Sequence, residues 1–277
     1  MTPGRIEREL RHGFRQALES SRWKRHQVFL ELFAGCGRIA LCWQSQGFGA
    51  MGFELSRGAE FDLTHPRVRR LIAGWIRSGC VCGIWLATPC STWSRARRGP
   101  RDSAWGPLRD LVITGNPGLS PKDQAKVEAG NRTAQATAYI INLAIALKVP
   151  TALENPASSR LWEAPCLRRA LSHRSCSTVV VTMCSFGARW RKATKVALWH
   201  RSIPDCSARS CHGPRGSCQH SGQPHIQLVG RLTAQASAYP SSFATWGAKL
   251  ISNAADKLAD DNRRRLVSDL RPTASVT

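Results

Sequence analysis

The sequence predicts an α/β fold with a central, mostly parallel sheet and helices on both of its faces. Short apolar runs alternate with segments of helical periodicity from Val28 onward, a texture typical of β-α-β units whose strands are buried on both sides. The runs stop at glycine, proline or polar residues, as strands do where they pass into turns. A chain of 277 residues is long enough for one substantial core and a small second module.

The expected elements follow from these two textures. Strands are expected at 28–32, 50–54, 82–87, 150–156, 177–186 and 193–199, the last two as a hairpin. Helices are expected at 37–47, 68–79, 120–148 and 231–262, with a long loop at 99–120. Ser120 and Pro121 fit the cap and the first position of the third helix. Gly130 predicts a break within that helix.

The chain is strongly basic. Lys and Arg number 40 against 18 Asp and Glu, which gives a formal net charge of +22. A charge of this size predicts a polyanionic partner, DNA or RNA. A general solubility bias is the alternative, but arginines gather beside the candidate nucleophile described below, which favours nucleic acid.

The cysteines predict free thiols. Eleven are present, an odd number, and several lie inside apolar runs, where a free thiol behaves as a small hydrophobe. Residues 1–26 are polar and basic, without the apolar stretch of a secretory signal, and no run approaches the ~18 residues that span a bilayer. We therefore expect a reducing compartment, the nucleus or the cytoplasm, and no membrane association. We also expect a monomer.

Four chemically unusual spots lie where apolar runs end: Phe33-Ala34-Gly35, Glu54, Pro89-Cys90 and Glu154-Asn155. Ligands bind at the carboxyl ends of the strands in an open α/β sheet, and parallel strands bring these ends to one edge. The four spots are therefore expected to border a single site.

The segment from Phe33 to Gly37 predicts a cofactor site. Its glycines allow a tight turn and a close backbone approach to a cofactor above a helix N-terminus. The short glycine pattern fits S-adenosylmethionine better than a dinucleotide. Glu54 ends the next strand, where an acidic side chain would bind ribose hydroxyls, and Asp62 could reach the adenine amine. The alternative is a plain strand-to-helix turn with a surface glutamate.

Cys90 and Glu154 are the candidate reacting groups. A thiolate at the end of a buried strand is a strong nucleophile once its pKa falls below ~8.5. A partly desolvated carboxyl can keep its proton and donate it to a ring nitrogen. The alternatives are a buried structural cysteine and a glutamate in a cap or an ion pair. The arginines that would favour the thiolate and hold a polyanion are Arg95, Arg97, Arg98 and Arg101.

Taken in order, LELFAGCG, Glu54, TPCS, LENP and CSFG followed by RKATKVALW resemble the DNA cytosine carbon-5 methyltransferases. The LENP and CSFG–RKAT forms are most similar to compact phage-type or mobile-element members. The resemblance covers residues 28–200, with a weaker similarity at 231–243. It implies a Rossmann-like fold that is typical of S-adenosylmethionine-dependent methyltransferases.

The resemblance implies a covalent mechanism. Cys90 would attack carbon 6 of cytosine, and Glu154 would protonate or hydrogen-bond ring N3. Asn155 would position its loop, and Pro89 would shape the turn that presents the thiol. Carbon 5 is hidden in a duplex, so the partner would be double-stranded DNA with a flipped cytosine. Further basic residues expected to hold the nucleic-acid backbone are Arg189, Arg191, Lys192 and Lys195.

The expected domain organisation follows the same boundaries. It consists of a basic lead-in (1–27), a catalytic domain (28–200), a small Cys/His-rich insert in place of a target-recognition region (201–230), a helical segment that completes the catalytic domain (231–262) and a tail (263–277).

Some family features are absent from the sequence. The usual Gln-x-Arg-x-Arg strand and the closing Gly-Asn motif do not occur. An inactive, basic nucleic-acid-binding relic of the fold is therefore one alternative. An RNA cytosine methyltransferase is another, because net charge does not distinguish DNA from RNA.

The insert at 201–230 suggests a metal site. Cys206, Cys211, Cys218 and His225 follow a C-x4-C-x6-C-x6-H spacing. Such a set could enclose a tetrahedral zinc ion, which would stabilise a segment too small for a core of its own. The alternative is a solvated loop with incidental thiols.

Overall fold

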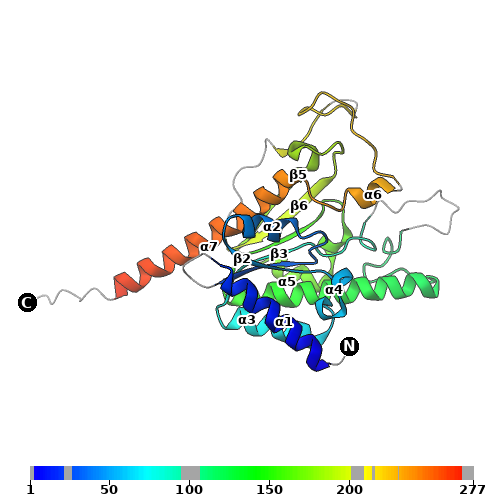
Figure 1. Cartoon of the computed structure of the whole chain (residues 1–277). Coiled ribbons are helices and arrows are strands. Elements are labelled where there is room, and N and C mark those ends of the chain that lie inside the picture. Colours follow the sequence, from blue (N-terminus) through cyan, green and yellow to red (C-terminus); the bar gives the residue numbers. More distant parts are fainter. Residues whose placement is uncertain are drawn as a thin grey trace, which may run out of the picture.

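The computed structural model describes residues 3–21, 27–94, 107–200, 209–213, 216–229 and 231–269 (Figure 1). Its centre is a six-stranded sheet with the strand order β2-β1-β3-β4-β6-β5. The strands are β1 (Val28–Leu32), β2 (Gly49–Phe53), β3 (Val81–Leu86), β4 (Thr151–Pro156), β5 (Cys176–Thr182) and β6 (Ala193–Trp199). All neighbours are parallel except β6, which runs antiparallel to β4 and β5. The predicted fold class and hairpin are confirmed.

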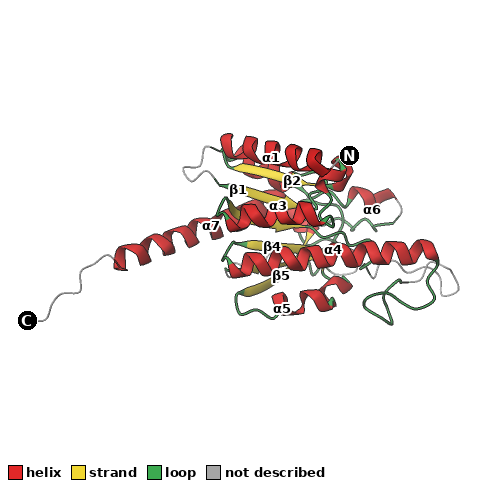
Figure 2. Ribbon diagram, turned by 90° about the horizontal axis from the view of Figure 1, so that it is seen from below, coloured by secondary structure: helices red, strands yellow, loops and turns green. Residues whose placement is uncertain are grey.

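Helices cover both faces of the sheet. The α-helices are α1 (Pro3–Glu19), α2 (Arg38–Ser45), α3 (Pro66–Arg77), α4 (Pro121–Ala146), α5 (Arg168–Leu171), α6 (Arg231–Gln235) and α7 (Ser241–Asp269). Short 3-10 helices are η1 (Leu55–Arg57), η2 (Ala59–Phe61), η3 (Arg160–Glu163), η4 (Pro165–Leu167) and η5 (Met183–Phe186). α1, α3 and α4 lie side by side on one face (Figure 2), and α2 packs with α7 on the other. No helix in the described part of the chain is long and apolar enough to cross a membrane.

The central strands divide their side chains between two cores, because successive residues of a strand point to opposite faces. In β3, Ile84 and Leu86 contact the core under α1, α3 and α4, whereas Trp85 contacts the core under α2 and α7. Burial on both faces explains why these strands read as unbroken apolar runs.

α1 is part of the first core, within the segment expected to be a basic lead-in at 1–27. Ile6, Leu10 and Phe14 are buried along one stripe of the helix. Phe14 stacks on Trp75 of α3 with ring centroids 4.0 Å apart. The lead-in therefore contributes to the same hydrophobic core as the strands.

Two helices differ from what the sequence predicted. The break expected at Gly130 is wrong, because α4 runs through it unbroken. A Cβ at Gly130 would clash with Thr92 Oγ1 and lie 2.8 Å from Arg109 Nη2, so the glycine lets these two side chains pack close to the helix. α7 continues to Asp269, past the predicted end at residue 262, since neither proline nor glycine interrupts it there.

Candidate active site

The carboxyl ends of the parallel strands are aligned at one edge of the sheet. Leu32 pairs with Phe53 and with Leu86, and Leu86 pairs with Leu153. Two further backbone hydrogen bonds, from Ala34 N to Phe53 O (2.8 Å) and from Ala87 N to Leu32 O (3.0 Å), extend this alignment beyond the strands. All four spots that the sequence singled out begin close after these positions, so they share this edge.

Phe33, Gly35 and Gly37 form a turn with a left-handed backbone at every second residue, with φ angles of 59°, 54° and 74°. Glycine adopts this conformation freely, whereas Phe33 is strained there. Gly35 N donates a hydrogen bond of 2.7 Å to Glu54 Oε2, which ties the turn to the end of β2. Nothing lies within 4 Å of a Cβ built on Gly35, so the turn is open on that side. Together with Ala34, these residues form a cradle that is exposed at Gly35, although Ala34 and Gly37 are buried, and that could hold a cofactor.

Glu31, which the sequence did not single out, lies in β1 and its buried carboxyl points to the start of α2. Glu31 is fully buried in β1, and its Oε2 accepts a hydrogen bond of 2.7 Å from Ala40 N. Burial raises the pKa of Glu31 from 4.5 to about 7, although hydrogen bonds from the α2 backbone lower it. Oε1 has no hydrogen-bond partner among the described residues. A buried acceptor beside the cradle suits the cationic end of a cofactor.

Asp62 has a local structural role. Its Oδ1 accepts hydrogen bonds from Thr64 N at 2.8 Å and from Thr64 Oγ1 at 2.7 Å, just before α3. These bonds fix the turn that follows η2. A contact between Asp62 and an adenine amine stays a prediction.

Cys90 begins a tight turn after β3. Cys90 O accepts hydrogen bonds from Trp93 N at 2.9 Å and Ser94 N at 2.8 Å. Pro89 before it is exposed, and Cys90 itself is half-buried. The thiol is therefore held at the edge of the sheet by a turn of fixed backbone conformation.

A buried arginine from the predicted loop holds this turn in place. Arg109 Nε donates to Thr92 O and Nη2 donates to Thr92 Oγ1, both at 3.1 Å. Further bonds reach Val127 O and Asn131 Oδ1 of α4, at 2.9 and 2.8 Å. The guanidinium also lies 3.5 Å from the ring centre of Trp93. Burial lowers the pKa of Arg109 to about 10, so it remains charged at neutral pH.

Glu154 is buried and linked to a tyrosine from the C-terminal segment. Tyr239 Oη donates a hydrogen bond of 2.7 Å to Glu154 Oε2, and Trp85 Nε1 donates to Tyr239 Oη at 3.4 Å. Burial raises the pKa of Glu154, against smaller lowering effects of Lys192 and Tyr239. Glu154 Oε1 has no partner among the described residues. A buried carboxyl that retains its proton can serve as a hydrogen-bond donor.

Cys90, Glu154 and Lys192 lie close enough for their charges to interact. Burial raises the pKa of Cys90, the charge of Lys192 lowers it, and the charge of Glu154 raises it. Lys192 Nζ also donates a hydrogen bond of 3.0 Å to Ala236 O. The sequence predicted Lys192 as a contact to the nucleic-acid backbone, and here its charge also acts on the thiol and the carboxyl.

Asn155 connects β4 with the turn that carries Cys90. Its Nδ2 donates a hydrogen bond of 2.6 Å to Thr88 O. Thr88 Oγ1 and Thr137 Oγ1 are 2.7 Å apart, which attaches the same turn to α4. Asn155 thereby holds the Cys90 turn and the Glu154 strand at a fixed separation, in agreement with a positioning role.

The other predicted nucleic-acid residues are dispersed. Arg189 and Arg191 are exposed on the turn between β5 and β6. Lys195 is half-buried on β6, with Nζ 4.8 Å from the ring centre of Trp162. Arg95, Arg97, Arg98 and Arg101 lie outside the described residues.

Three of the four predicted metal ligands come together. Cys211, Cys218 and His225 lie near one another, joined by Cys184, which the sequence analysis did not include. Cys206 lies outside the described residues. The spacing within the insert could not reveal Cys184, because it belongs to the preceding hairpin.

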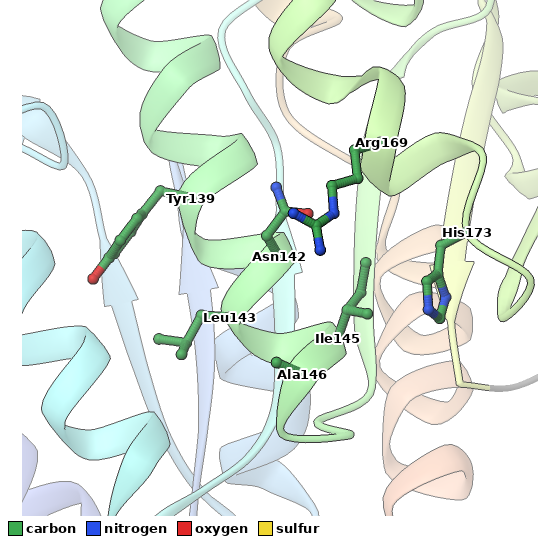
Figure 3. Close-up of a pocket in the computed structure, with 7 residues that line it drawn as sticks. All are labelled: Tyr139, Asn142, Leu143, Ile145, Ala146, Arg169 and His173. Atoms are coloured by element: carbon green, nitrogen blue, oxygen red, sulfur yellow. The ribbon is translucent and has the colours of Figure 1, made fainter.

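A surface pocket of about 630 Å³ lies at the opposite edge of the sheet (Figure 3). It is lined by Tyr139, Asn142, Leu143, Ile145, Ala146, Arg169 and His173. These residues come from the last turns of α4 and from the segment before β5, next to the amino ends of β4 and β5. The pocket is therefore separate from the site around Cys90.

Comparisons with known proteins give partial likenesses in structure. The sequence matches no known family and no curated protein. The Entamoeba histolytica methyltransferase EhMeth is 8% identical over 62% of this chain and 52% of its own, with a TM-score of 0.35. The S. pombe Dnmt2 methyltransferase is 15% identical over 71% of this chain and 58% of its own, with a TM-score of 0.36. A mutant of Spodoptera frugiperda DNMT2 is 11% identical over 62% of this chain and 50% of its own, with a TM-score of 0.34. This chain thus spans about half the length of these structures, and so partial a likeness assigns no activity by itself.

Proposed function

We propose that this protein transfers a methyl group from S-adenosylmethionine to carbon 5 of cytosine in DNA, through a covalent bond between Cys90 and the base. One observation carries the proposal: a thiol and a fully buried carboxyl with a raised pKa interact at the carboxyl edge of a parallel sheet, next to a glycine cradle. These are the groups that addition to a cytosine ring requires.

Cys90 acts as the nucleophile at carbon 6 of the ring. Its pKa is raised by burial and by the charge of Glu154, and lowered by Lys192. A thiolate is therefore favoured when Glu154 is protonated and Lys192 is charged. Lys192 would stabilise the thiolate before the attack.

Glu154 acts as the acid. Because burial raises its pKa and so favours the protonated form, it can donate a proton to ring N3 as Cys90 adds. The addition leaves an electron-rich carbon 5, which accepts the methyl group. A base then removes the proton from carbon 5, N3 returns its proton to Glu154, and elimination releases Cys90 and the methylated cytosine.

The cradle at Phe33, Ala34, Gly35 and Gly37 would hold S-adenosylmethionine, which supplies the methyl group when bound. The exposed backbone of Gly35 allows close approach, and Glu54 lies at hydrogen-bond distance from the same turn. The unpartnered Oε1 of Glu31 would accept from the amino group of the cofactor. Asp62 would contact the adenine.

DNA is the proposed substrate because the net charge of +22 calls for a polyanion. Cytosine carbon 5 lies inside the duplex, so the base must be flipped out at a cost of a few kcal/mol. Arg189, Arg191 and Lys195, with the arginines at 95–101, would hold the backbone. RNA satisfies the same charge requirement, so both polymers belong in the test.

The decisive experiment measures transfer of a labelled methyl group to duplex DNA and to RNA, with bisulfite sequencing of the product. A duplex that contains 5-fluorocytosine should trap a covalent adduct with the wild type and none with Cys90→Ser. Cys166→Ser, a half-buried cysteine away from the site, is the matched control. Methylation that survives Cys90→Ser would exclude the covalent mechanism. If the protein methylates RNA and not DNA, RNA would be the substrate in place of DNA.

A further inference from the structure

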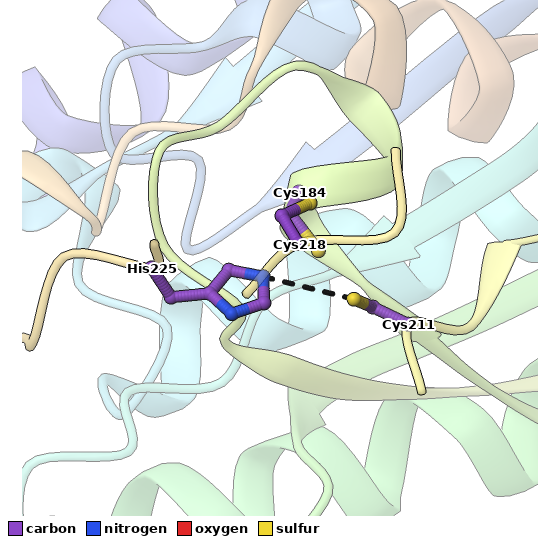
Figure 4. Close-up of side chains that lie close together, drawn as sticks. All are labelled: Cys184, Cys211, Cys218 and His225. Atoms are coloured by element: carbon purple, nitrogen blue, oxygen red, sulfur yellow. Dashed lines mark hydrogen bonds between the residues drawn. The ribbon is translucent and has the colours of Figure 1, made fainter. Parts of the chain in front are cut away.

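Three cysteines and one histidine converge beyond the end of β5. Cys184 lies on η5, directly after β5, whereas Cys211, Cys218 and His225 lie in the segments 209–213 and 216–229. Their sulfur and ring nitrogen atoms all lie within 4.8 Å of one another (Figure 4). Cys211 Sγ and His225 Nε2 are 3.7 Å apart. We call these four residues the Cys3His cluster.

We propose that the Cys3His cluster binds a single zinc ion that fixes the segments 209–213 and 216–229 to the end of the β5–β6 hairpin. This proposal does not depend on the methyltransferase activity. Three thiols and an imidazole form a soft donor set that selects zinc over magnesium or calcium. Four protein ligands leave no open coordination position, so the site would be structural.

The spacing of the donor atoms fits a tetrahedral ion. Zinc binds sulfur at ~2.3 Å and nitrogen at ~2.0–2.1 Å, which separates neighbouring ligand atoms by roughly 3.5–3.8 Å. The distance of 3.7 Å between Cys211 Sγ and His225 Nε2 already has this value. The largest separation, 4.8 Å, would need to shorten by about one ångström, which side-chain rotation can supply.

The described part of this segment has almost no apolar core of its own. Among its described residues only Cys211 and Cys218 are buried. The local hydrophobic cluster consists of these two thiols and Cys184, without an aliphatic or aromatic side chain. A small segment without an apolar core needs a cross-link, and the three thiols are free rather than joined as disulfides.

A small hairpin positions two of the ligands. Ser217 and Pro224 form an isolated antiparallel bridge. Inside it, Cys218 N donates to Gln223 O at 2.8 Å and Gly222 N donates to Cys218 O at 2.7 Å. Cys218 follows Ser217 and His225 follows Pro224. The two ligands therefore lie on opposite arms of this hairpin, which backbone hydrogen bonds hold together.

The cluster joins this segment to the basic turn of the sheet. Ser210 Oγ donates to Val180 O of β5 at 3.2 Å. Ile226 N donates to Arg189 O at 2.9 Å, between β5 and β6. A zinc ion would therefore fix the turn that carries the exposed Arg189 and Arg191.

The test uses the full chain purified under reducing conditions without chelator, with metal content measured by mass spectrometry. We expect one zinc per chain. Cys184→Ser, Cys211→Ser, Cys218→Ser and His225→Ala should each lose it. Cys82→Ala should retain it, because Cys82 is buried in the core under α2 and α7. Cys206→Ser should retain it as well, which separates this ligand set from the one that sequence spacing favours.

Cobalt substitution keeps the test informative if a variant fails to fold. The wild type loaded with cobalt should show thiolate-to-metal charge-transfer bands and the visible bands of a tetrahedral site. Wild-type protein that contains no zinc after reconstitution would overturn the proposal. Loss of zinc in Cys206→Ser with retention in Cys184→Ser would also overturn it, as would a disulfide between cluster cysteines in freshly purified protein.

Discussion

Tyr239 Oη donates a hydrogen bond of 2.7 Å to Glu154 Oε2, and the two residues are 85 positions apart in the sequence. Both side chains are buried. The hydrogen bond lowers the pKa of Glu154, while burial, the larger effect, raises it. The C-terminal segment thus orients the carboxyl that the proposed mechanism uses as an acid.

Tyr239→Phe should weaken catalysis without unfolding the protein. The substitution removes the hydrogen bond to Glu154 and the longer one from Trp85 Nε1, and should lower the unfolding free energy by about 1–2 kcal/mol. Because Tyr239 lowers the pKa of Glu154, its loss should raise that pKa further, and the alkaline limb of the pH–rate profile should move to higher pH. Tyr139→Phe is the matched control, since Tyr139 is exposed on α4. An unchanged pH profile in Tyr239→Phe would show that the tyrosine does not position the acid.

Glu154→Gln should reduce methyl transfer by about 10²- to 10⁴-fold, the usual contribution of a general acid. Glutamine has similar shape but cannot give up a proton to ring N3. The measurement is kcat for methyl transfer at neutral pH, with circular dichroism as a check of folding. Glu163→Gln, at an exposed ion pair with Arg160, should retain wild-type activity. A fully active Glu154→Gln would remove the acid from the mechanism.

Arg109→Lys should destabilise the Cys90 turn. Lysine cannot reproduce the bonds from one guanidinium to Thr92, Val127 and Asn131 or its stacking on Trp93. We expect a loss of about 3 kcal/mol in unfolding free energy, as for other disrupted buried charges. Thermal unfolding measures this, with the exposed Arg132→Lys as control. Equal melting temperatures of the two variants would contradict this role of Arg109.

Glu31 should make stability depend on pH. Its pKa of about 7 in the folded protein exceeds the value of 4.5 expected for the unfolded chain. The folded state therefore retains a proton that the unfolded state releases, and stability should fall as pH rises from 4.5 to 7 and then level off. This fall should amount to about 3 kcal/mol. The measurement is denaturant unfolding at several pH values, in which Glu31→Gln should lose this part of the fall and Glu128→Gln should keep it. Parallel wild-type and Glu31→Gln curves would disprove the assignment.

The strand positions and the common edge were within reach of the sequence. Short apolar runs that end at turn residues predicted the strands. Parallel strands bring their carboxyl ends together for geometric reasons alone. Phe33, Glu54 and Glu154 were therefore expected at one edge, and the register of β1 with β2 and β3, and of β3 with β4, agrees.

The supporting contacts were not predictable. Arg109 lies in a stretch read as loop, and nothing near it in the sequence indicates that it would be buried against Thr92 and Trp93. Gly130 was predicted to break the helix because glycine often does so. Its contact with Arg109 was not foreseen, because Arg109 is 21 residues away in the sequence. Such contacts depend on how α4 packs on the sheet, and the residue pattern within a short stretch of sequence does not predict that packing.

By itself the sequence determined the α/β class, the places where strands end and the residue types gathered there, because these depend on hydrophobic periodicity and turn chemistry within short windows. Only the tertiary structure decided that Tyr239 holds Glu154, that the charge of Lys192 acts on Cys90 and that Cys184 completes the Cys3His cluster. Each of these contacts joins residues from separate segments, and side chains so far apart meet only when the burial of the whole core fixes how the segments pack.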